Sequence, residues 1–301
     1  SACLVGSEMC IRDSYNIAIE GSFDDCQKIV KELFNDDSFR LKINMSGVNS
    51  INWARIVCQI VYYFYAYFKL KKENISFSVP TGNFGDIYAG YIAKKMGLSI
   101  NKLIVATNEN DILERVISTG EYKPEKVKPS ISPSMDIQVA SNFERLLFYV
   151  VGQDDKKVSL LMDNLTKKGS FKLDQNEIQE IKKDFEAVKI DDETTRLIIK
   201  NINDEFKFII DPHTATGIGA ARKVKGIENI VVIGTAHPFK FSDTVQSATG
   251  INLEAPPHLK MNIDKKEDQI PKEFKQLAKD FAEKGFITTS LDNLVNWART
   301  G

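Results

Sequence analysis

The residues best suited to chemistry lie in a glycine turn, VPTGNFGD, at positions 79–86. The stretch from Phe77 predicts a short buried strand, which Pro80 ends because it has no N–H to donate. Gly82 and Gly85 permit positive φ and close backbone approach, and helical apolar spacing follows them. A glycine turn that opens a helix points several backbone N–H groups at one spot, at the positive end of the helix dipole. Such a cup most often binds phosphate.

The spacing of this turn does not identify its ligand. No Gly-Lys-Ser/Thr follows, so it is not a Walker A loop, and it does not match Gly-x-Gly-x-x-Gly. From spacing alone, two readings stay open: a phosphate site, or an ordinary strand–turn–helix corner of an α/β protein.

Composition excludes several classes of protein. The 301 residues are 43% hydrophobic and 27% charged, as in an ordinary globular protein, and the net charge of −1 gives no electrostatic case for nucleic acid or an anionic membrane. The four cysteines lack the spacing of a zinc site or disulfide framework, which fits a reducing, cytoplasmic setting. With three histidines, we expect no metal site.

The elements that must position the turn alternate between strands and helices. Buried strands are predicted at 103–107, 208–210 and 229–235, the last ending in Thr235. Strands alternating with helices predict an open, mostly parallel sheet flanked by helices, with a ligand crevice at the carboxyl ends of the strands. The glycine turn and Thr235 are both expected at that edge.

A polar loop leads into an apolar helix that starts at Trp53. The helix is apolar nearly all round, which predicts burial. Polar residues such as Arg55 and Lys69 interrupt it, so we reject a membrane span.

Arg55 has two readings. It either pairs with a carboxylate or reaches solvent, or it faces an anionic ligand together with Asn49, Ser50 and Asn52.

Helix-start signals occur twice in the middle of the chain. Ser141 with Glu144, and Asp174 with Glu177, have the spacing of capping boxes. The charged section 153–205 reads as helical.

The chain divides into three parts. Residues 1–14 read as a non-native leader rather than a signal peptide. Residues 15–250 carry a strand at 15–21, a helix from Phe23 and the elements above. Residues 251–301 read as a polar, helical segment.

Seven phrases, taken in order, resemble threonine synthase, a fold-type-II pyridoxal-phosphate enzyme. They are Asn16–Cys26 (NIAIEGSFDDC), Ser46–Arg55 (SGVNSINWAR), Val79–Asp86 (VPTGNFGD), Ala106–Asp111 (ATNEND), Ser132–Ile137 (SPSMDI), Asp211–Ala215 (DPHTA) and Thr235–Pro238 (TAHP).

The resemblance implies a tryptophan-synthase-beta-like fold and a reaction. Threonine synthases use pyridoxal 5′-phosphate to convert O-phosphohomoserine and water into L-threonine and phosphate, the final step of threonine biosynthesis. It implies that Gly82, Asn83, Phe84, Gly85 and Asp86 hold the cofactor phosphate. Residues 15–250 would then be the cofactor-binding large domain with part of the small domain.

The resemblance further implies that the hydroxyl of Thr235 faces the pyridine nitrogen of the cofactor. The substrate-binding candidates remain Asn49, Ser50, Asn52 and Arg55, proposed from their polarity before the apolar helix.

One departure from the family is serious. The family's Schiff-base lysine lies in a phrase like His-Gly-Pro-Thr-x-x-Phe-Lys-Asp, and no such phrase occurs in the 301 residues. We therefore expect a C-terminal fragment that is inactive by itself. The alternatives are another fold-type-II lyase, such as a serine/threonine dehydratase, and a non-catalytic, ligand-binding relative.

Overall fold

The computed structural model describes residues 23–42, 45, 47 and 51–256. The chain forms two compact units, one of residues Gly47–Leu253 and one of Ser1–Ser46 with Glu254–Gly301. In the latter unit, helices α1 (Phe23–Asn35) and α2 (Asp37–Lys42) are described, and α1 confirms the helix predicted from Phe23. The leader at 1–14, the strand predicted at 15–21 and the chain past residue 256 lie outside the described residues.

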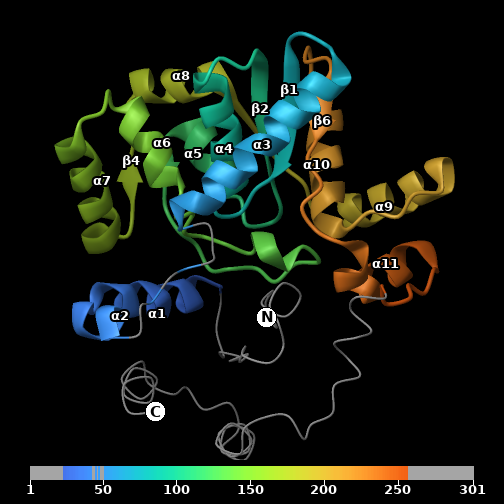
Figure 1. The fold of residues 1–301 in the computed structure, drawn as a ribbon, viewed down its shortest axis with the longest axis horizontal. Helices are drawn as coiled ribbons and strands as arrows, with labels where there is room; N and C mark the ends of the chain where they lie inside the picture. The colour runs from blue at the N-terminus through green and yellow to red at the C-terminus, as the bar shows by residue number, and fades with distance from the viewer. Residues whose placement is uncertain (1–22, 43–44, 46, 48–50, 257–301) are drawn as a thin grey trace, which may run out of the picture. The chain divides into compact units, whose positions relative to one another are not determined.

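The larger unit is built on a four-stranded parallel sheet in the order β5-β2-β1-β6 (Figure 1). Its strands are β1 (Ile75–Pro80), β2 (Ile100–Thr107), β5 (Phe185–Lys189) and β6 (Ile230–Val232). A two-stranded antiparallel ribbon joins β3 (Glu121–Tyr122) to β4 (Phe171–Lys172). The parallel sheet predicted from the alternation of strands and helices is confirmed.

Helices cover both faces of this sheet. They are α3 (Trp53–Leu70), α4 (Gly85–Lys95), α5 (Ile112–Thr119), α6 (Phe143–Val150), α7 (Asp155–Lys168), α8 (Gln175–Asp184), α9 (Asp192–Phe206), α10 (Pro212–Lys223) and α11 (Ser242–Thr249), with 3₁₀ turns η1 (Pro133–Met135) and η2 (Pro238–Phe241).

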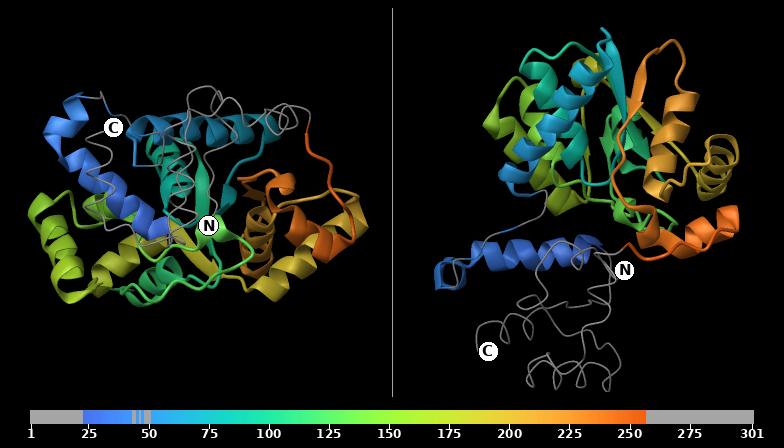
Figure 2. Two further views of the ribbon diagram at one scale, coloured as in Figure 1. Left: turned by 90° about the horizontal axis from the view of Figure 1, so that it is seen from below. Right: turned by 45° about the vertical axis from the view of Figure 1, so that its right-hand side comes forward.

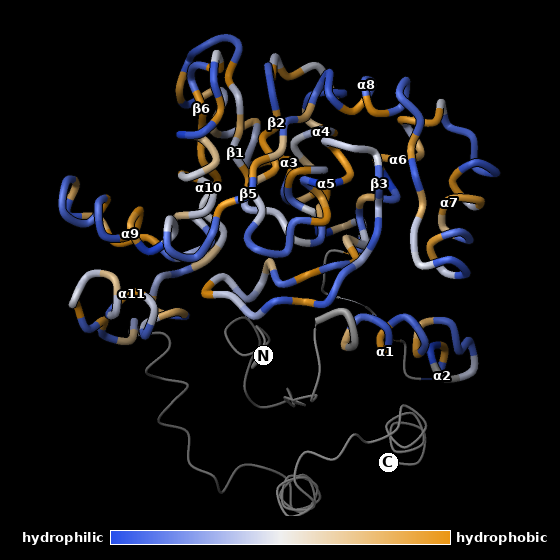
Figure 3. Tube along the Cα trace, turned by 180° about the vertical axis from the view of Figure 1, so that it is seen from behind, coloured by the Kyte–Doolittle hydropathy of each residue, from blue (hydrophilic) through white to orange (hydrophobic). Residues whose placement is uncertain are grey.

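The two faces of the sheet bury different clusters. Phe77 and Val105 belong to the large core under α4, α5 and α8, whereas Ile104 and Ala106 pack against α10 on the opposite face. All six residues of β1 are buried, as expected for a parallel strand covered on both sides. Outer helices such as α7 and α9 alternate hydrophilic and hydrophobic residues along their length (Figure 3), and Figure 2 shows the sheet between its helical layers.

One strand prediction and one helix prediction were wrong. Residues 208–210 form no strand, and β5 lies in the section that we expected to be helical. The chain leaves α8 at Asp184 and enters β5 at Phe185, where the ladder to β2 pairs Phe185 with Leu103. Pairing with a distant strand decided this segment, and its charged local sequence gave no sign of it.

The burial predicted for the apolar helix was also wrong. Helix α3 buries Ile56, Ile60 and Tyr63, whereas most of its other large apolar residues are exposed. Periodicity gives the position of an apolar face but not the presence of a partner to cover it.

Of the two predicted capping boxes, one is confirmed. Asp174 and Glu177 make both reciprocal bonds at the start of α8. Helix α6 instead starts after Asn142 with no side-chain cap, and Ser141 makes no such bond.

Candidate functional site

The glycine turn connects β1 to α4 and is held by one hydrogen bond to the end of β2 and one to its own Asn83 side chain. Thr81 donates its N–H to the carbonyl oxygen of Ala106 at 2.8 Å, which ties the turn to the end of β2. Asn83 accepts a hydrogen bond from the N–H of Gly85 at 2.9 Å. Phe84, the N-cap of α4, lies in the left-handed region with φ 66° and makes no side-chain hydrogen bond to the helix. The first N–H groups of α4 have no partner within the helix. Asn83 takes that of Gly85, and Phe84 adds no side-chain cap.

Gly82 is required because a second loop lies directly against it. A Cβ at this position would lie 2.9 Å from Cδ1 of Ile137, 3.0 Å from the carbonyl oxygen of Ser134 and 3.1 Å from Cα of Met135. Two of these three atoms are backbone and cannot rotate away. The segment 132–137 is thus the wall behind the glycine turn.

A buried polar network holds that wall in place at the end of β2. The Oδ1 of Asp136 accepts from Nδ2 of Asn108 at 2.8 Å, from Nδ2 of Asn110 at 3.0 Å and from Oγ of Ser130 at 2.6 Å. Its Oδ2 accepts from the N–H of Ser130 at 2.9 Å. The phrases ATNEND and SPSMDI therefore meet in space and bind each other.

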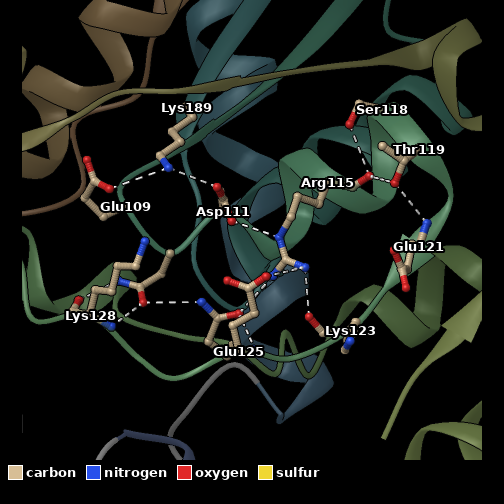
Figure 4. A network of polar contacts seen from close by, with 12 residues as sticks. Glu109, Asp111, Arg115, Ser118, Thr119, Glu121, Lys123, Glu125, Lys128 and Lys189 are labelled. Carbon is tan, nitrogen blue, oxygen red and sulfur yellow. Dashed lines mark hydrogen bonds and ion pairs between the residues drawn. The ribbon is translucent and has the colours of Figure 1, made fainter.

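The acidic residues of the first phrase point into ion pairs rather than toward the turn. Lys189 lies 3.5 Å from Glu109 and 3.0 Å from Asp111, and Arg115 lies 2.9 Å from Asp111 and 3.4 Å from Glu125 (Figure 4). Burial raises the pKa of Asp111, but hydrogen bonds from Lys189 and Arg115 outweigh it and lower the pKa. These contacts join the end of β2 to β5 and α5.

The amino end of α10 contacts the same wall. Nε2 of His213 accepts from the N–H of Ser134 at 3.2 Å, and Nδ1 lies 3.0 Å from Oδ1 of Asp211. The ring proton therefore sits on Nδ1, which donates to the buried carboxylate. Asp211 also caps α10. This link between the phrases DPHTA and SPSMDI had no signal in the sequence, since nothing local indicates which loop a buried histidine meets.

Thr235 follows β6, the strand next to β1. The register pairs Ser76 with Ile230 and Ser78 with Val232, so Thr235 lies three residues past the last paired residue of β6. Thr235 is exposed at this edge. His237 caps η2, because its Nδ1 accepts from the N–H of Phe239 at 3.2 Å.

The sheet changes direction between β1 and β6. The chain runs outward from β1 to β2 and β5, then returns to place β6 on the other side of β1. Ligands of open α/β sheets bind at such a switch point, outside the carboxyl ends of the strands. The glycine turn and Thr235 are the residues that follow these two strands.

Asp86, in the first turn of α4, has an unusual environment. Tyr63 donates its hydroxyl to the carbonyl oxygen of Asp86 at 2.8 Å and to Oδ1 at 3.0 Å. Burial raises the pKa of Asp86 to about 6, although the hydrogen bond from Tyr63 and the positive charge of Arg55 lower it. Burial likewise raises the pKa of Tyr63 well above its usual value. Tyr63 was not predicted, because it lies within a run of aromatic residues in which no single position stands out.

The predicted substrate-binding loop is only partly described. Asn49 and Ser50 lie outside the described residues. Asn52 caps α3, accepting from the N–H of Ala54 at 3.0 Å and donating to the carbonyl oxygen of Gly47 at 2.7 Å. Arg55 is exposed.

Two buried hydroxyls beside the turn have no hydrogen-bond partner among the described residues. They belong to Thr107, which follows Ala106, and to Ser141. The N–H of Asn142, next to Ser141, donates to the carbonyl oxygen of Asn83 at 3.0 Å. Buried polar groups in native proteins nearly always have a hydrogen-bond partner, so these two hydroxyls are available to a hydrogen-bonding ligand.

Comparison with known proteins identifies the family that the chain resembles. A family model described as "Threonine synthase, C-terminal" matches residues 214–284. Threonine synthase of Pseudomonas aeruginosa is 48% identical over 238 residues, covering 78% of this chain. Over most of its length, the chain is therefore similar to the C-terminal part of threonine synthases. It spans about half the length of its curated relatives, 51% of the Pseudomonas protein and 54% of the threonine synthase of Saccharomyces cerevisiae, which is 41% identical.

Solved threonine synthases share the fold. The PLP-bound enzyme from Brucella melitensis matches with a TM-score of 0.76 at 46% identity, covering 83% of this chain and 55% of that one. The yeast threonine synthase matches with a TM-score of 0.69 at 41% identity. The predicted fold class, an open, mostly parallel sheet of fold type II represented only in part, is confirmed. In the described part of the chain, no helix has the length and hydropathy of a membrane span.

Proposed function

We propose that this chain forms the cofactor-phosphate side of a threonine synthase, which converts O-phosphohomoserine and water into L-threonine and phosphate. The observation that carries the proposal is the amino end of α4, opened by a glycine turn at the switch point of the sheet, in a chain 41–48% identical to threonine synthases. A helix amino terminus opened by a glycine turn binds phosphate through backbone N–H groups.

The proposed cofactor is pyridoxal 5′-phosphate. The backbone of Gly82, Asn83, Phe84, Gly85 and Asp86 would hold its phosphate, and the hydroxyl of Thr235 would face the pyridine nitrogen. When bound, the cofactor supplies an electron sink for deprotonation of the substrate carbons. A neutral hydroxyl at the ring nitrogen leaves that nitrogen largely unprotonated, whereas a carboxylate would favour its protonated form.

Asp86 is placed to shape the phosphate cup through its backbone. Its side chain is engaged by Tyr63, and a phosphate nearby would raise its pKa further, because like charges disfavour ionisation. We therefore propose that the main-chain N–H of Asp86 contacts the phosphate.

We assign the substrate phosphate to Arg55, Asn49 and Ser50. Because Asn52 caps α3, its proposed role is to fix the start of that helix and hence the position of Arg55. A reducing, cytoplasmic location is also proposed, because the four cysteines lack the spacing of a disulfide framework.

The test separates the phosphate end from the ring end of the cofactor. We expect the chain to bind pyridoxal 5′-phosphate more tightly than pyridoxal, with inorganic phosphate competing, as followed by cofactor fluorescence. Gly82→Val should abolish the preference for the phosphorylated form. Thr235→Ala should change the fluorescence of the bound pyridine ring, whereas inorganic phosphate should still compete with pyridoxal 5′-phosphate for binding. Thr166→Ala, on exposed helix α7, is the control.

Equal binding of pyridoxal and its phosphate would contradict the proposal. A separate assay follows phosphate release from O-phosphohomoserine. Because the lysine phrase of the family is absent from the sequence, we expect no turnover by this chain alone, and turnover would refute that expectation.

A further inference from the structure

Helix α3 has two apolar faces, and only one of them is covered within the described part of the chain. Ile56, Ile60 and Tyr63 form the buried face, and Tyr63 packs edge-on against Phe77 with ring centroids 4.8 Å apart. The neighbouring face carries a stripe with helical spacing: Trp53, Val57, Val61, Tyr65 and Phe68, which are 43%, 45%, 61%, 66% and 65% exposed. Trp53 lies at the edge of this stripe next to the buried face, where its ring packs edge-on against Tyr88 with centroids 6.3 Å apart. We call these five residues the α3 stripe.

The α3 stripe differs from a solvated helix face. Only Arg55 and Lys69 are charged among the 18 residues of α3. Helix α7, by contrast, exposes Leu160 singly among lysines and aspartates. Scattered apolar residues are normal on a surface, but a contiguous apolar patch marks an interaction site.

We propose that the α3 stripe is the seat of the amino-terminal half of the threonine synthase chain, the half of the relatives that this chain does not span. The chain covers 51–55% of its relatives and includes their C-terminal family match. The unspanned half of those relatives therefore precedes the matched part. In Figure 1, α3 lies in front of α4 and the sheet, with its outer side turned away from them.

The size of the stripe favours a segment of the same polypeptide over a second copy. A helix of 18 residues is about 27 Å long and about 10 Å wide, so its face offers only a few hundred Å². A stable interface between separate proteins buries about 800 Å² on each partner. A covalently connected segment avoids most of the entropic cost of association, so this smaller area is sufficient for it.

The location of the stripe couples it to the candidate site. Tyr63, on the buried face of α3, holds Asp86 in the first turn of α4. A segment seated on α3 would therefore fix the helix that positions one rim of the phosphate cup.

Cysteine labelling tests the occupant. Val61→Cys and Leu160→Cys are compared in this chain, where the two native side chains are 61% and 60% exposed. The aligned positions are compared in full-length Pseudomonas threonine synthase, with maleimide labelling followed peptide by peptide. In this chain, we expect both cysteines to react at similar rates. In the full-length enzyme, the position aligned with Val61 should react at least about tenfold more slowly than the other, at every protein concentration.

Three results would overturn the proposal. They are equal reactivity at the two positions of the full-length enzyme, protection that grows with protein concentration and so indicates a second copy, and protection already present in this chain.

A charge substitution gives an independent measurement. Val61→Glu should lower the melting temperature of the full-length enzyme by about 5 °C or more and leave that of this chain unchanged, whereas Leu160→Glu should change neither. Equal melting temperatures for the two full-length variants would also contradict it.

Discussion

The hydroxyl of Tyr63 donates to two oxygens of Asp86, the main-chain carbonyl at 2.8 Å and Oδ1 at 3.0 Å. Tyr63 comes from the middle of α3, and Asp86 lies in the first turn of α4. One buried phenol thus fixes the helix terminus that forms the candidate phosphate cup. The rim of this site is held by a helix that does not itself contribute to the cup.

Tyr63→Phe tests this link. This substitution removes the hydroxyl that donates to the buried carboxyl group of Asp86. Leaving that acceptor without its partner should lower the free energy of unfolding by about 1–3 kcal/mol. Urea denaturation measures this loss. Tyr62→Phe is the matched control, because Tyr62 is 51% exposed, and it should be neutral. Equal losses in the two variants would show that the hydrogen bond contributes nothing.

Asp86 should make stability depend on pH. Burial raises its folded pKa to about 6 from 3.8, so between these values the folded chain binds more protons than the unfolded chain. Stability from this group is therefore highest in acid and declines as pH rises through about 6, by at most about 3 kcal/mol. Asp86→Asn removes the titration. The difference in unfolding free energy between native chain and variant should favour the variant progressively from pH 4 to pH 7, and a constant difference would exclude a raised pKa.

Gly82→Ala should damage the turn. Its Cβ would meet backbone atoms of Ser134 and Met135 at 3.0 and 3.1 Å, so the wall segment must move, at a cost of about 1–3 kcal/mol. Gly234→Ala is the control, because its Cβ would meet only Oγ1 of Thr214, at 3.8 Å. Thermal denaturation compares the two. A Gly82 variant as stable as the Gly234 variant would show that the wall yields freely.

Asp136→Asn should loosen the wall itself. The new amide would present donors to Asn108 and Asn110, which already donate to that carboxylate. We expect a loss of about 2–3 kcal/mol and faster amide exchange in residues 130–137. Asp163→Asn, at an exposed ion pair with Lys167, should cost less than about 1 kcal/mol. Unchanged exchange in 130–137 would argue against a positioning role for Asp136.

Local sequence was sufficient to predict the ends of helices and strands where the chemistry of a residue limits the backbone. Pro80 ends β1, the glycine turn starts α4, and Asp174 with Glu177 starts α8, all as predicted. These features depend on φ limits and on hydrogen bonds between residues a few positions apart.

Local sequence failed where a distant partner decided the outcome. The segment at Phe185 is a strand because Leu103 pairs with it, and 208–210 has no such neighbour in the described sheet. Ser141 does not cap α6, where Asn142 precedes the helix and donates its Nδ2 to the carbonyl oxygen of Asn83 at 3.2 Å.

By itself, the sequence indicated the resemblance to threonine synthases, the parallel sheet and the glycine turn. These can be read without knowing any tertiary contact, because they depend on the order of short phrases and on the backbone preferences of neighbouring residues. Only the tertiary structure decided that β6, which precedes Thr235, pairs with β1, that Asp136 and His213 hold the wall behind Gly82, and that Tyr63 meets Asp86. These contacts join residues far apart in the chain. They exist because burial of the sheet brings strand ends together, where each buried polar group must find a partner.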